Sequence, residues 1–401
     1  MREPGARRAF VLVIDACGIG ALPDAAAYGD EGTNTLVHLA EAVGGLRLPT
    51  MQRLGLGSIL ELEGVAPVED HAVIGRLHPL GPGKDSISGH WELMGVVLDA
   101  PLPTYPSGFP ASLVARLEGV MGHAVICNRP ANGLAAIEEF GAEHLANGAL
   151  ILYTSQDSVA QLAAHVDRVD VQELYRTCER ARAELHGADA VGRVIARPFR
   201  GTVGAFERTD GRRDFSLTPP GRSYLQELEQ RGVHVYGVGK IHDLFAGVGV
   251  SSSHPGATNA RALESVSELA ESVEEGLVFV NLIETDQLYG HRKDAEGFHR
   301  ALIEIDSFLG RLLKALRVGD LLVVSADHGV DPAHPGTDHT REQVPLIALT
   351  GAMAKAIGRG GLLGGARHDG PMADVGATVL SWLTAAEETQ GPLPGRAFPV
   401  G

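Results

Sequence analysis

The sequence predicts an α/β fold with a mainly parallel sheet flanked by helices. Short apolar runs, typical of buried strands, recur along the chain. Amphipathic helical patterns lie between them, and the order strand, helix, strand favours parallel pairing. Several of the apolar runs are also followed closely by Asp or His. Because ligands gather at the carboxyl ends of parallel strands, this arrangement indicates a site at one edge of the sheet.

The clearest strand predictions are the runs at residues 9–14, 150–153, 234–238, 277–283 and 321–325. A long helix is predicted between the last two runs. Its apolar positions recur every three or four residues, and Gly319 provides a stop; they are Phe298, Leu302, Ile305, Leu309, Leu312, Leu313 and Leu316. The Gly- and Ala-rich stretch 351–366 is predicted to be a surface loop.

The chain has 401 residues, which is too long for one compact core, so we expect two domains. Two proline-rich stretches are candidate hinges: one contains Pro101, Pro103, Pro106 and Pro110, and the other is residues 218–221. We therefore expect an inserted domain at residues 99–221. Residues 1–98 and 222–401 would form a metal-binding core that is split in sequence but joined in space.

Composition narrows the classes of partner. The formal net charge is −16, and an acidic chain repels nucleic acid and anionic lipid, so neither is expected as a partner. The three cysteines, Cys17, Cys127 and Cys178, are far apart, which suggests a reducing compartment. No apolar run is long enough for a membrane span, and residues 1–4 do not resemble the start of a signal peptide. We expect a cytoplasmic protein.

Three Asp lie at or near strand ends, and three His lie close to them in sequence or further along the chain. The six potential metal ligands are Asp15, Asp286, His291, Asp327, His328 and His339. Three carboxylates and three imidazoles are enough donors for two divalent ions, and this mixture suits Zn or Mn. Two such ions can hold the attacking and leaving oxygens of a displacement at phosphorus. The alternative for any one of them is an ordinary polar residue at a strand end. The order of the whole set favours a metal site.

Ser86 is the candidate nucleophile. It follows a Gly-rich turn and Asp85, a plausible helix start, where free backbone N–H groups favour phosphate. A serine hydroxyl is a weak nucleophile that a divalent ion can activate. The alternative is that Asp85 or Ser86 is simply a helix N-cap. Ser88 is the nearest competing hydroxyl.

A basic stretch supplies candidates for substrate binding. Residues 193–213 contain six arginines and only two acids in an otherwise acidic chain. Arginine binds phosphate through two parallel hydrogen bonds. Lys240 follows another predicted strand, and the polar residues 154–158 could bind sugar hydroxyls. The alternatives are a solvated basic face and a polar turn.

Together these segments resemble the phosphopentomutase family of the alkaline phosphatase superfamily. The resemblance covers nearly the whole chain. The segments 286–291, 326–329 and 338–342 match the superfamily, and KDSISGHWE at 84–92 and LYGHR at 288–292 are similar to the mutases themselves. One departure is Ser86, where the family typically has Thr.

The resemblance implies a fold, a cofactor and site residues. It implies an alkaline-phosphatase-like core with an inserted smaller α/β cap domain for substrate binding. It implies two Mn ions, one held by Asp286, His291 and His339 and the other by Asp15, Asp327 and His328. Ser86 would carry the transferred phosphoryl group. The substrate's phosphate would contact Arg193, Arg208 and Lys240, and its ribose Ser155 and Asp157.

The implied activity is the interconversion of α-D-ribose 1-phosphate and D-ribose 5-phosphate, and of the 2-deoxyribose pair, in nucleoside salvage. The partner is then a small phosphorylated pentose, with a bisphosphorylated sugar as activator. One alternative is a metal-dependent phosphatase or phosphodiesterase on the same core. Another is a non-catalytic protein that binds metal or a sugar phosphate.

Overall fold

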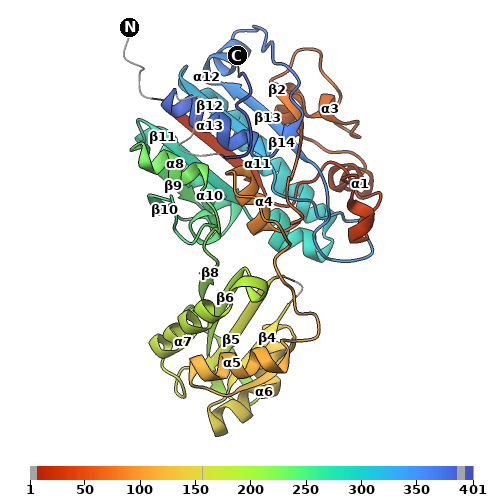
Figure 1. Ribbon diagram of the computed structural model, residues 1–401. Helices are drawn as coiled ribbons and strands as arrows, with labels where there is room; N and C mark the ends of the chain where they lie inside the picture. Colours follow the sequence, from red (N-terminus) through yellow and green to blue (C-terminus); the bar gives the residue numbers. More distant parts are fainter. Residues whose placement is uncertain (1–6, 156, 386–392, 401) are drawn as a thin grey trace. The chain divides into compact units, whose positions relative to one another are not determined.

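A computed structural model describes residues 7–155, 157–385 and 393–400. The chain divides into two compact units (Figure 1). The first unit comprises Met1–Pro101 and Pro219–Gly401, and the second is Leu102–Thr218. The insert was expected at residues 99–221. Each unit has its own sheet and is described by itself.

The first unit is built on an eight-stranded sheet of order β10-β9-β11-β1-β12-β13-β2-β14. The run from β10 to β12 is parallel throughout, whereas β13 is antiparallel to both of its neighbours. The predicted mainly parallel sheet is therefore confirmed. The strands are β1 (Arg8–Ile14), β2 (Val73–His78), β9 (Val235–Val238), β10 (Ser252–His254), β11 (Gly276–Leu282), β12 (Asp320–Ser325), β13 (Val344–Thr350) and β14 (Gly370–Pro371).

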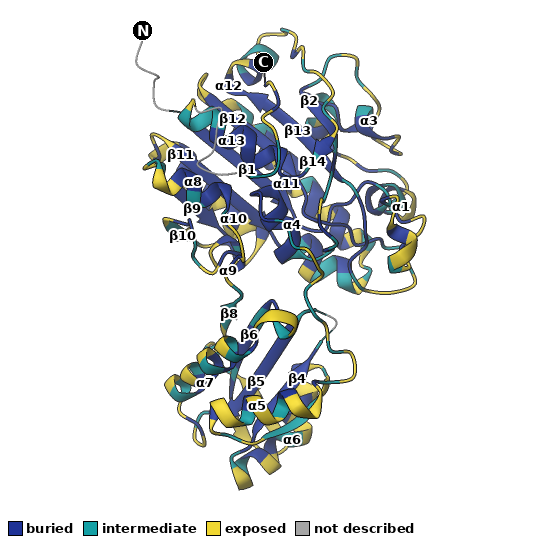
Figure 2. Cartoon of the chain, viewed as in Figure 1, coloured by how far each residue is buried: buried dark blue, intermediate teal, exposed yellow. Residues whose placement is uncertain are grey.

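Every residue of the central strands β1, β11 and β12 is buried (Figure 2). Helices therefore cover both faces of this sheet. Helix α13 contacts these three strands, and α10 contacts β11 and β9. The helices are α1 (Thr35–Val43), α2 (Pro49–Leu54), α3 (Leu56–Ile59), α4 (Ser86–Leu93), α8 (Tyr224–Gln230), α9 (Ile241–Leu244), α10 (Asn259–Ser272), α11 (Ala295–Ala315), α12 (Gly351–Ile357) and α13 (Asp374–Thr384), with short turns η1 (Ala25–Tyr28), η3 (Thr285–Tyr289) and η4 (Gly290–Arg292).

The second unit has a sheet of order β3-β4-β5-β6-β7, with β8 also paired to β6. Helices α5 and α7 pack around one apolar cluster, and α6 packs with Phe199 and Phe206 in another. The strands are β3 (Val125–Pro130), β4 (Leu150–Thr154), β5 (Val159–His165), β6 (Arg193–Thr202), β7 (Ala205–Arg208) and β8 (Arg213–Ser216). The helices are α5 (Ala111–Met121), α6 (Gly133–Asn147), α7 (Val171–Glu184) and the short turn η2 (Gly187–Asp189).

The five predicted strands correspond to β1, β4, β9, β11 and β12, and the predicted long helix is α11. The prediction of a loop at 351–366 is wrong for its first half, which forms α12. The Thr350 side chain caps this helix by accepting a hydrogen bond from the N–H of Met353. Met, Ala and Lys then favour helix despite the glycine content of the stretch.

A buried ion pair joins the amino ends of β1 and β12. Arg8 donates two hydrogen bonds to Asp320, at 2.9 and 2.6 Å, and both side chains are almost fully buried. We expect Asp320→Asn to destabilise the fold by about 3–5 kcal/mol, because it leaves the Arg8 charge buried without its partner. Urea unfolding followed by tryptophan fluorescence measures this, since both tryptophans, Trp91 and Trp382, lie in the first unit.

The matched control is the exposed pair Arg200–Glu207 in the second unit. Glu207→Gln removes a carboxylate of the same kind of pair at the surface, and its effect should stay below about 1 kcal/mol. Equal effects at the two sites would mean that burial does not decide the stability contributed by Arg8 and Asp320.

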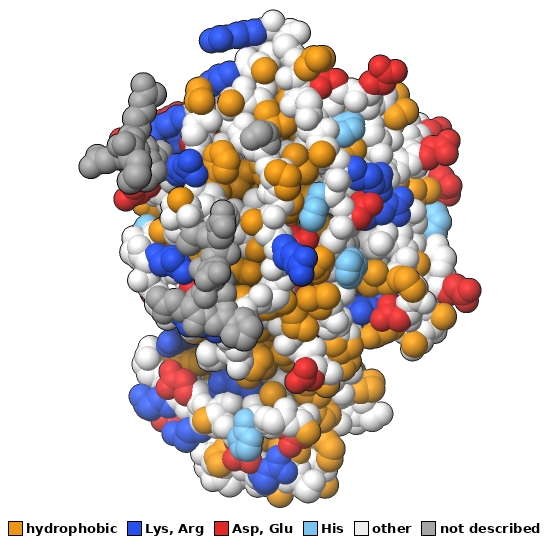
Figure 3. All heavy atoms as spheres, turned by 45° about the horizontal axis from the view of Figure 1, so that its top comes forward, with side chains coloured by type: hydrophobic (Ala, Val, Ile, Leu, Met, Phe, Trp, Pro, Cys, Tyr) orange, Lys and Arg blue, Asp and Glu red, His pale blue; other side chains and the backbone are white. Residues whose placement is uncertain are grey.

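The surface carries charges of both signs. On the face drawn in Figure 3, acidic and basic side chains are interspersed among hydrophobic and neutral ones. None of the helices in the described part of the chain combines the length and the apolar character that crossing a bilayer requires.

Candidate metal centre and active site

Three adjacent parallel strands bring the candidate carboxylates together. Strand β1 lies between β11 and β12, and all three run in the same direction. Asp15 follows β1 directly, Asp327 lies two residues after β12, and Asp286 lies in the turn after β11. Residues far apart in sequence therefore meet at the carboxyl edge of one sheet, as the sequence predicted for ligands in this fold.

Asp286 lies in the π-helical turn η3, a rare conformation that is frequent at functional sites. A reciprocal pair of hydrogen bonds anchors the start of this turn. The N–H of Asn259 donates to the Glu284 carboxylate at 2.9 Å, and the N–H of Glu284 donates to the Asn259 side chain at 3.2 Å. Helix α10 thus holds the segment that carries Asp286.

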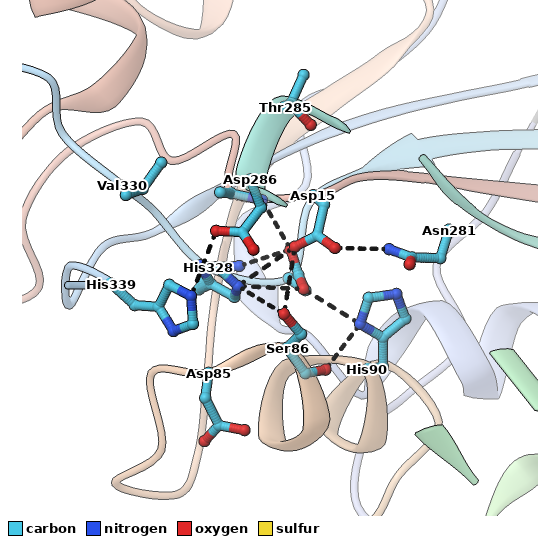
Figure 4. A network of polar contacts seen from close by, with 12 residues as sticks. Asp15, Asp85, Ser86, His90, Asn281, Thr285, Asp286, His328, Val330 and His339 are labelled. Atoms are coloured by element: carbon cyan, nitrogen blue, oxygen red, sulfur yellow. Dashed lines mark hydrogen bonds and ion pairs between the residues drawn. The ribbon is translucent and has the colours of Figure 1, made fainter. Parts of the chain in front are cut away.

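The six candidate ligands form one continuous cluster. Nε2 of His291 and Nε2 of His339 each lie 3.3 Å from Oδ1 of Asp286. Nε2 of His328 lies 3.3 Å from Oδ1 of Asp15 and 3.4 Å from Oδ2 of Asp327. Among the described residues of the first unit, ligand atoms within 4.8 Å of one another form two groups, Asp15–Asp327–His328 and Asp286–His328–His339. Figure 4 shows Asp15, Asp286, His328 and His339 converging above Ser86.

The charges in this cluster are strongly coupled. Burial and the neighbouring Asp327 carboxylate raise the pKa of Asp15. Burial would also raise the pKa of Asp286 and of Asp327. His339 and His291 outweigh it for Asp286, and His328 and His90 outweigh it for Asp327, so both carboxyls have a lowered pKa.

The donor set fits divalent cations. Oδ1 of Asp286 and Oδ2 of Asp327 are buried and make no hydrogen bond within the described residues, although imidazole nitrogens face both. Nε2 of His291 and Nε2 of His339 also face each other at 3.2 Å. Carboxylate oxygens and imidazole nitrogens that converge in this way suit a shared metal ion, and the mixture is typical of Zn or Mn.

Ser86 is the first residue of α4, as the sequence predicted. Its Oγ lies 3.4 Å from Oδ1 of Asp15 and 3.2 Å from Nε2 of His328. Asp85 is the N-cap and accepts hydrogen bonds from the N–H groups of Ile87 and Ser88. The capping role therefore belongs to Asp85, whose side chain points away from the cluster (Figure 4), and the Ser86 hydroxyl points toward the cluster.

Ser88, the competing hydroxyl, lies within a capping box. Its Oγ donates to Asp85, 2.7 Å from Oδ2, and accepts a hydrogen bond from the N–H of Asp85 at 3.2 Å. These contacts satisfy the hydroxyl locally. The geometry therefore favours Ser86 over Ser88 as the reactive group.

Two buried residues that contact the candidate ligands were not predicted from the sequence. Asn281 of β11 donates a hydrogen bond to Oδ2 of Asp15 at 2.9 Å, and His90 of α4 lies 3.2 Å from Oδ2 of Asp327. Both side chains are fully buried. The only signal in the sequence was a polar residue inside an otherwise apolar strand for Asn281, and the place of His90 four residues after Ser86.

The buried carboxylate of Glu342 was also not predicted from the sequence. It accepts hydrogen bonds from the N–H and hydroxyl of Thr35, the N–H of Gly20 and the hydroxyl of Thr340. Burial raises its pKa, and these donors oppose the shift. Glu342 thus joins the loop after β1 to the segment that carries His339.

Arg341 joins the same segment to the turn before Ser86. Its guanidinium donates to the carbonyl oxygen of Gly83 at 2.7 Å and to the Asp24 carboxylate, and it lies over the Tyr28 ring. The Tyr28 hydroxyl donates in turn to the carbonyl oxygen of Pro82. The backbone that leads to Ser86 is therefore held by side chains from two other loops.

The predicted substrate residues are divided between the units. Ser155, Asp157, Arg193 and Arg208 lie in the second unit, and Lys240 lies in the first, at the start of α9. Within the second unit, Arg193 lies 3.6 Å from Asp157, and Oγ of Ser155 accepts a hydrogen bond from the N–H of Asp157.

Gly89 allows α4 to approach the segment after β12. A Cβ added at Gly89 would lie 2.3 Å from the carbonyl oxygen of Asp327. We expect Gly89→Ala to push α4 outward and to lower activity about 100-fold, because misplacement by about 1 Å has effects of that size. Steady-state kinetics measure the loss. Gly119→Ala in α5 is the control, since a Cβ there meets nothing within 4 Å, and unchanged activity in both variants would contradict the expectation.

Comparison with known proteins identifies the family of the chain. A model of the Metalloenzyme superfamily matches residues 7–387. A phosphopentomutase of Dictyoglomus turgidum is 50% identical over 345 residues, which are 86% of this chain and 88% of that protein. A phosphopentomutase of Herpetosiphon aurantiacus is 46% identical over 394 residues and 98% of both chains.

A solved structure shares the fold at low identity. A Leishmania mexicana phosphoglycerate mutase, crystallised at low cobalt concentration, aligns over 100% of this chain and 99% of its own, with a TM-score of 0.51 and 14% identity. The relatives confirm the resemblance that the sequence indicated. The chain belongs to the phosphopentomutase family, whose members are isomerases that act as intramolecular phosphotransferases.

Proposed function

We propose that the chain interconverts α-D-ribose 1-phosphate and D-ribose 5-phosphate, and the 2-deoxyribose pair, through a phosphoserine at Ser86. The observation that supports this most is the Ser86 hydroxyl, 3.2 Å from Nε2 of His328 and 3.4 Å from Oδ1 of Asp15. Ser86 is also the first residue of α4, where the positive end of the helix dipole favours phosphate. The physiological setting is nucleoside salvage in the cytoplasm.

The proposed metal site holds two divalent ions, which we infer to be Mn. Asp286, His291 and His339 would hold one ion, and Asp15, Asp327 and His328 the other. When bound, the ions supply charge neutralisation at phosphorus and activation of the serine oxygen. Asn281 supports the proposal because its hydrogen bond orients Asp15, as partners behind metal ligands commonly do.

In the proposed reaction, phospho-Ser86 gives its phosphoryl group to the free hydroxyl of the substrate. The Ser86 O–P bond breaks, a bond from phosphorus to the sugar oxygen forms, and the proton lost by that hydroxyl is balanced by the one that Ser86 regains. The bisphosphate then returns its other phosphate to Ser86. The same bisphosphorylated sugar is the proposed activator, because it phosphorylates a free Ser86.

The second unit is proposed to be a substrate-binding cap. Arg193 and Arg208, with Lys240 of the first unit, would bind the phosphate, and Ser155 and Asp157 would bind the ribose. The local support is the close set of polar groups around Arg193, which faces both Asp157 and Asp214. A guanidinium that is ordered by carboxylates suits a planar, bidentate contact with phosphate.

Product analysis tests the proposal. Purified protein with Mn²⁺ and ribose 5-phosphate should form the 1-phosphate without stoichiometric release of inorganic phosphate. The measurement is phosphorus NMR after chelation with EDTA, which removes paramagnetic broadening. Dominant inorganic phosphate would instead support a phosphatase, and absence of turnover a binding protein. Water exclusion decides between transfer and hydrolysis, so phosphate release also measures how well the site is closed.

A further inference from the structure

His90 makes an unusual pair of contacts beside the proposed nucleophile. Its side chain is fully buried on α4 and lies against the Phe279 ring of β11, with ring centroids 6.0 Å apart. Nδ1 of His90 lies 2.8 Å from the carbonyl oxygen of Ser86 and 3.2 Å from Oδ2 of Asp327. In Figure 4, a dashed line joins the His90 ring to the carbonyl oxygen of Ser86.

The contacts determine which ring nitrogen carries a proton. A carbonyl oxygen and a carboxylate oxygen are both acceptors, so Nδ1 has to be the donor. Nε2 of His90 is buried and has no hydrogen-bond partner within the described residues. The ring therefore directs its polar interaction through Nδ1 alone.

We propose that His90 is a positioning residue that holds the backbone of Ser86 and the carboxylate of Asp327 in fixed relation. The inference rests on the proposed function of Ser86 and Asp327. Nδ1 of His90 contacts both the carbonyl oxygen of Ser86 and the carboxylate of Asp327. A rotation of either group would therefore lengthen a contact to this nitrogen. Its place resembles that of Asn281, which orients Asp15.

A purely structural role would explain the position less well. An apolar side chain of similar size would fill the space beside Phe279 without leaving Nε2 buried and unpaired, an arrangement with a desolvation cost. The two acceptors that Nδ1 faces both belong to the proposed reaction site. We therefore expect the N–H at the Nδ1 position of His90 to matter and the Nε2 position not to matter.

Two amide substitutions separate these positions. The amide nitrogen of Asn can occupy the place of Nδ1, whereas that of Gln reaches the place of Nε2. We expect His90→Gln to lower kcat 10–100-fold, the range typical of partners behind metal ligands, with KM changed less than about twofold. His90→Asn should keep most of the wild-type kcat, because its amide N–H replaces that of Nδ1. Mn²⁺ affinity, measured by calorimetry, should also fall in His90→Gln and recover in His90→Asn.

Phe279→Leu is the control for packing, since it disturbs the same ring contact without touching the polar groups. It should lower thermal stability while leaving kcat and Mn²⁺ affinity close to wild type. Equal kcat and equal Mn²⁺ affinity in the Asn and Gln variants would overturn the proposal, as would the same kcat loss in Phe279→Leu. A wild-type protein without phosphoserine at 86 would refute the proposed function instead, and the calorimetric comparison would still test the contact of His90 with Asp327.

Discussion

Ser86→Ala should abolish phosphoryl transfer while the protein keeps its fold and its metal ions. The substitution removes only Oγ, and the N-cap of α4 is supplied by Asp85 rather than by Ser86. Loss of a nucleophile typically lowers kcat by more than about 10⁴-fold, because no nearby group substitutes for it. A coupled assay for the isomer measures activity, and mass spectrometry of intact protein after incubation with a bisphosphorylated sugar measures the phosphoserine.

Ser88→Ala is the matched control on the same helix. Its hydroxyl belongs to the capping box with Asp85, so its removal should destabilise the protein by about 1 kcal/mol and leave transfer within about tenfold of wild type. An active Ser86→Ala protein together with an inactive Ser88→Ala protein would reassign the nucleophile to Ser88. Metal content by elemental analysis excludes loss of ions as the cause in either variant.

Removal of the divalent ions should abolish activity and lower the melting temperature on the order of 10 °C. At about 100 times its dissociation constant each ion would stabilise the native state by about 2.7 kcal/mol. In a unit of this size each kcal/mol corresponds to about 2–4 °C. The physical reason is the cluster itself: Oδ1 of Asp286 and Oδ2 of Asp327 are buried 3.3 and 3.4 Å from imidazole nitrogens, and a bound cation would stabilise their negative charge. Scanning calorimetry with EDTA and then with added Mn²⁺ measures the shift.

A pair of aspartate variants tests whether these particular carboxylates carry the effect. Asp286→Asn should lower Mn²⁺ affinity by more than about 100-fold, beyond the range of residues behind the ligands. Asp306→Asn is the control, because Asp306 is also buried but accepts hydrogen bonds from the N–H groups of Thr50 and Met51. Its melting temperature should fall, yet its rise on adding Mn²⁺ should match wild type. An unchanged Mn²⁺ response in Asp286→Asn would exclude Asp286 as a ligand.

Much of the site followed from sequence because its signals are local. Each of Asp15, Asp286 and Asp327 follows an apolar strand closely, and parallel strands place such residues at one edge. Ser86 was recognisable from the turn and the aspartate before it. The error at α12 was local as well: the glycines of 351–366 outweighed the helix formers in the prediction, although the Thr350 cap starts a helix there.

The sequence by itself determined the fold class, the family and the types of side chain in the candidate site. The reason is that strand periodicity, helix starts and candidate ligand residues are features of short segments. Only the tertiary structure decided which side chains contact the candidate ligands. Asn281 meets Asp15 across 266 residues and Thr35 meets Glu342 across 307. Such buried hydrogen bonds depend on strand order and helix packing, which bring together groups that no local pattern relates.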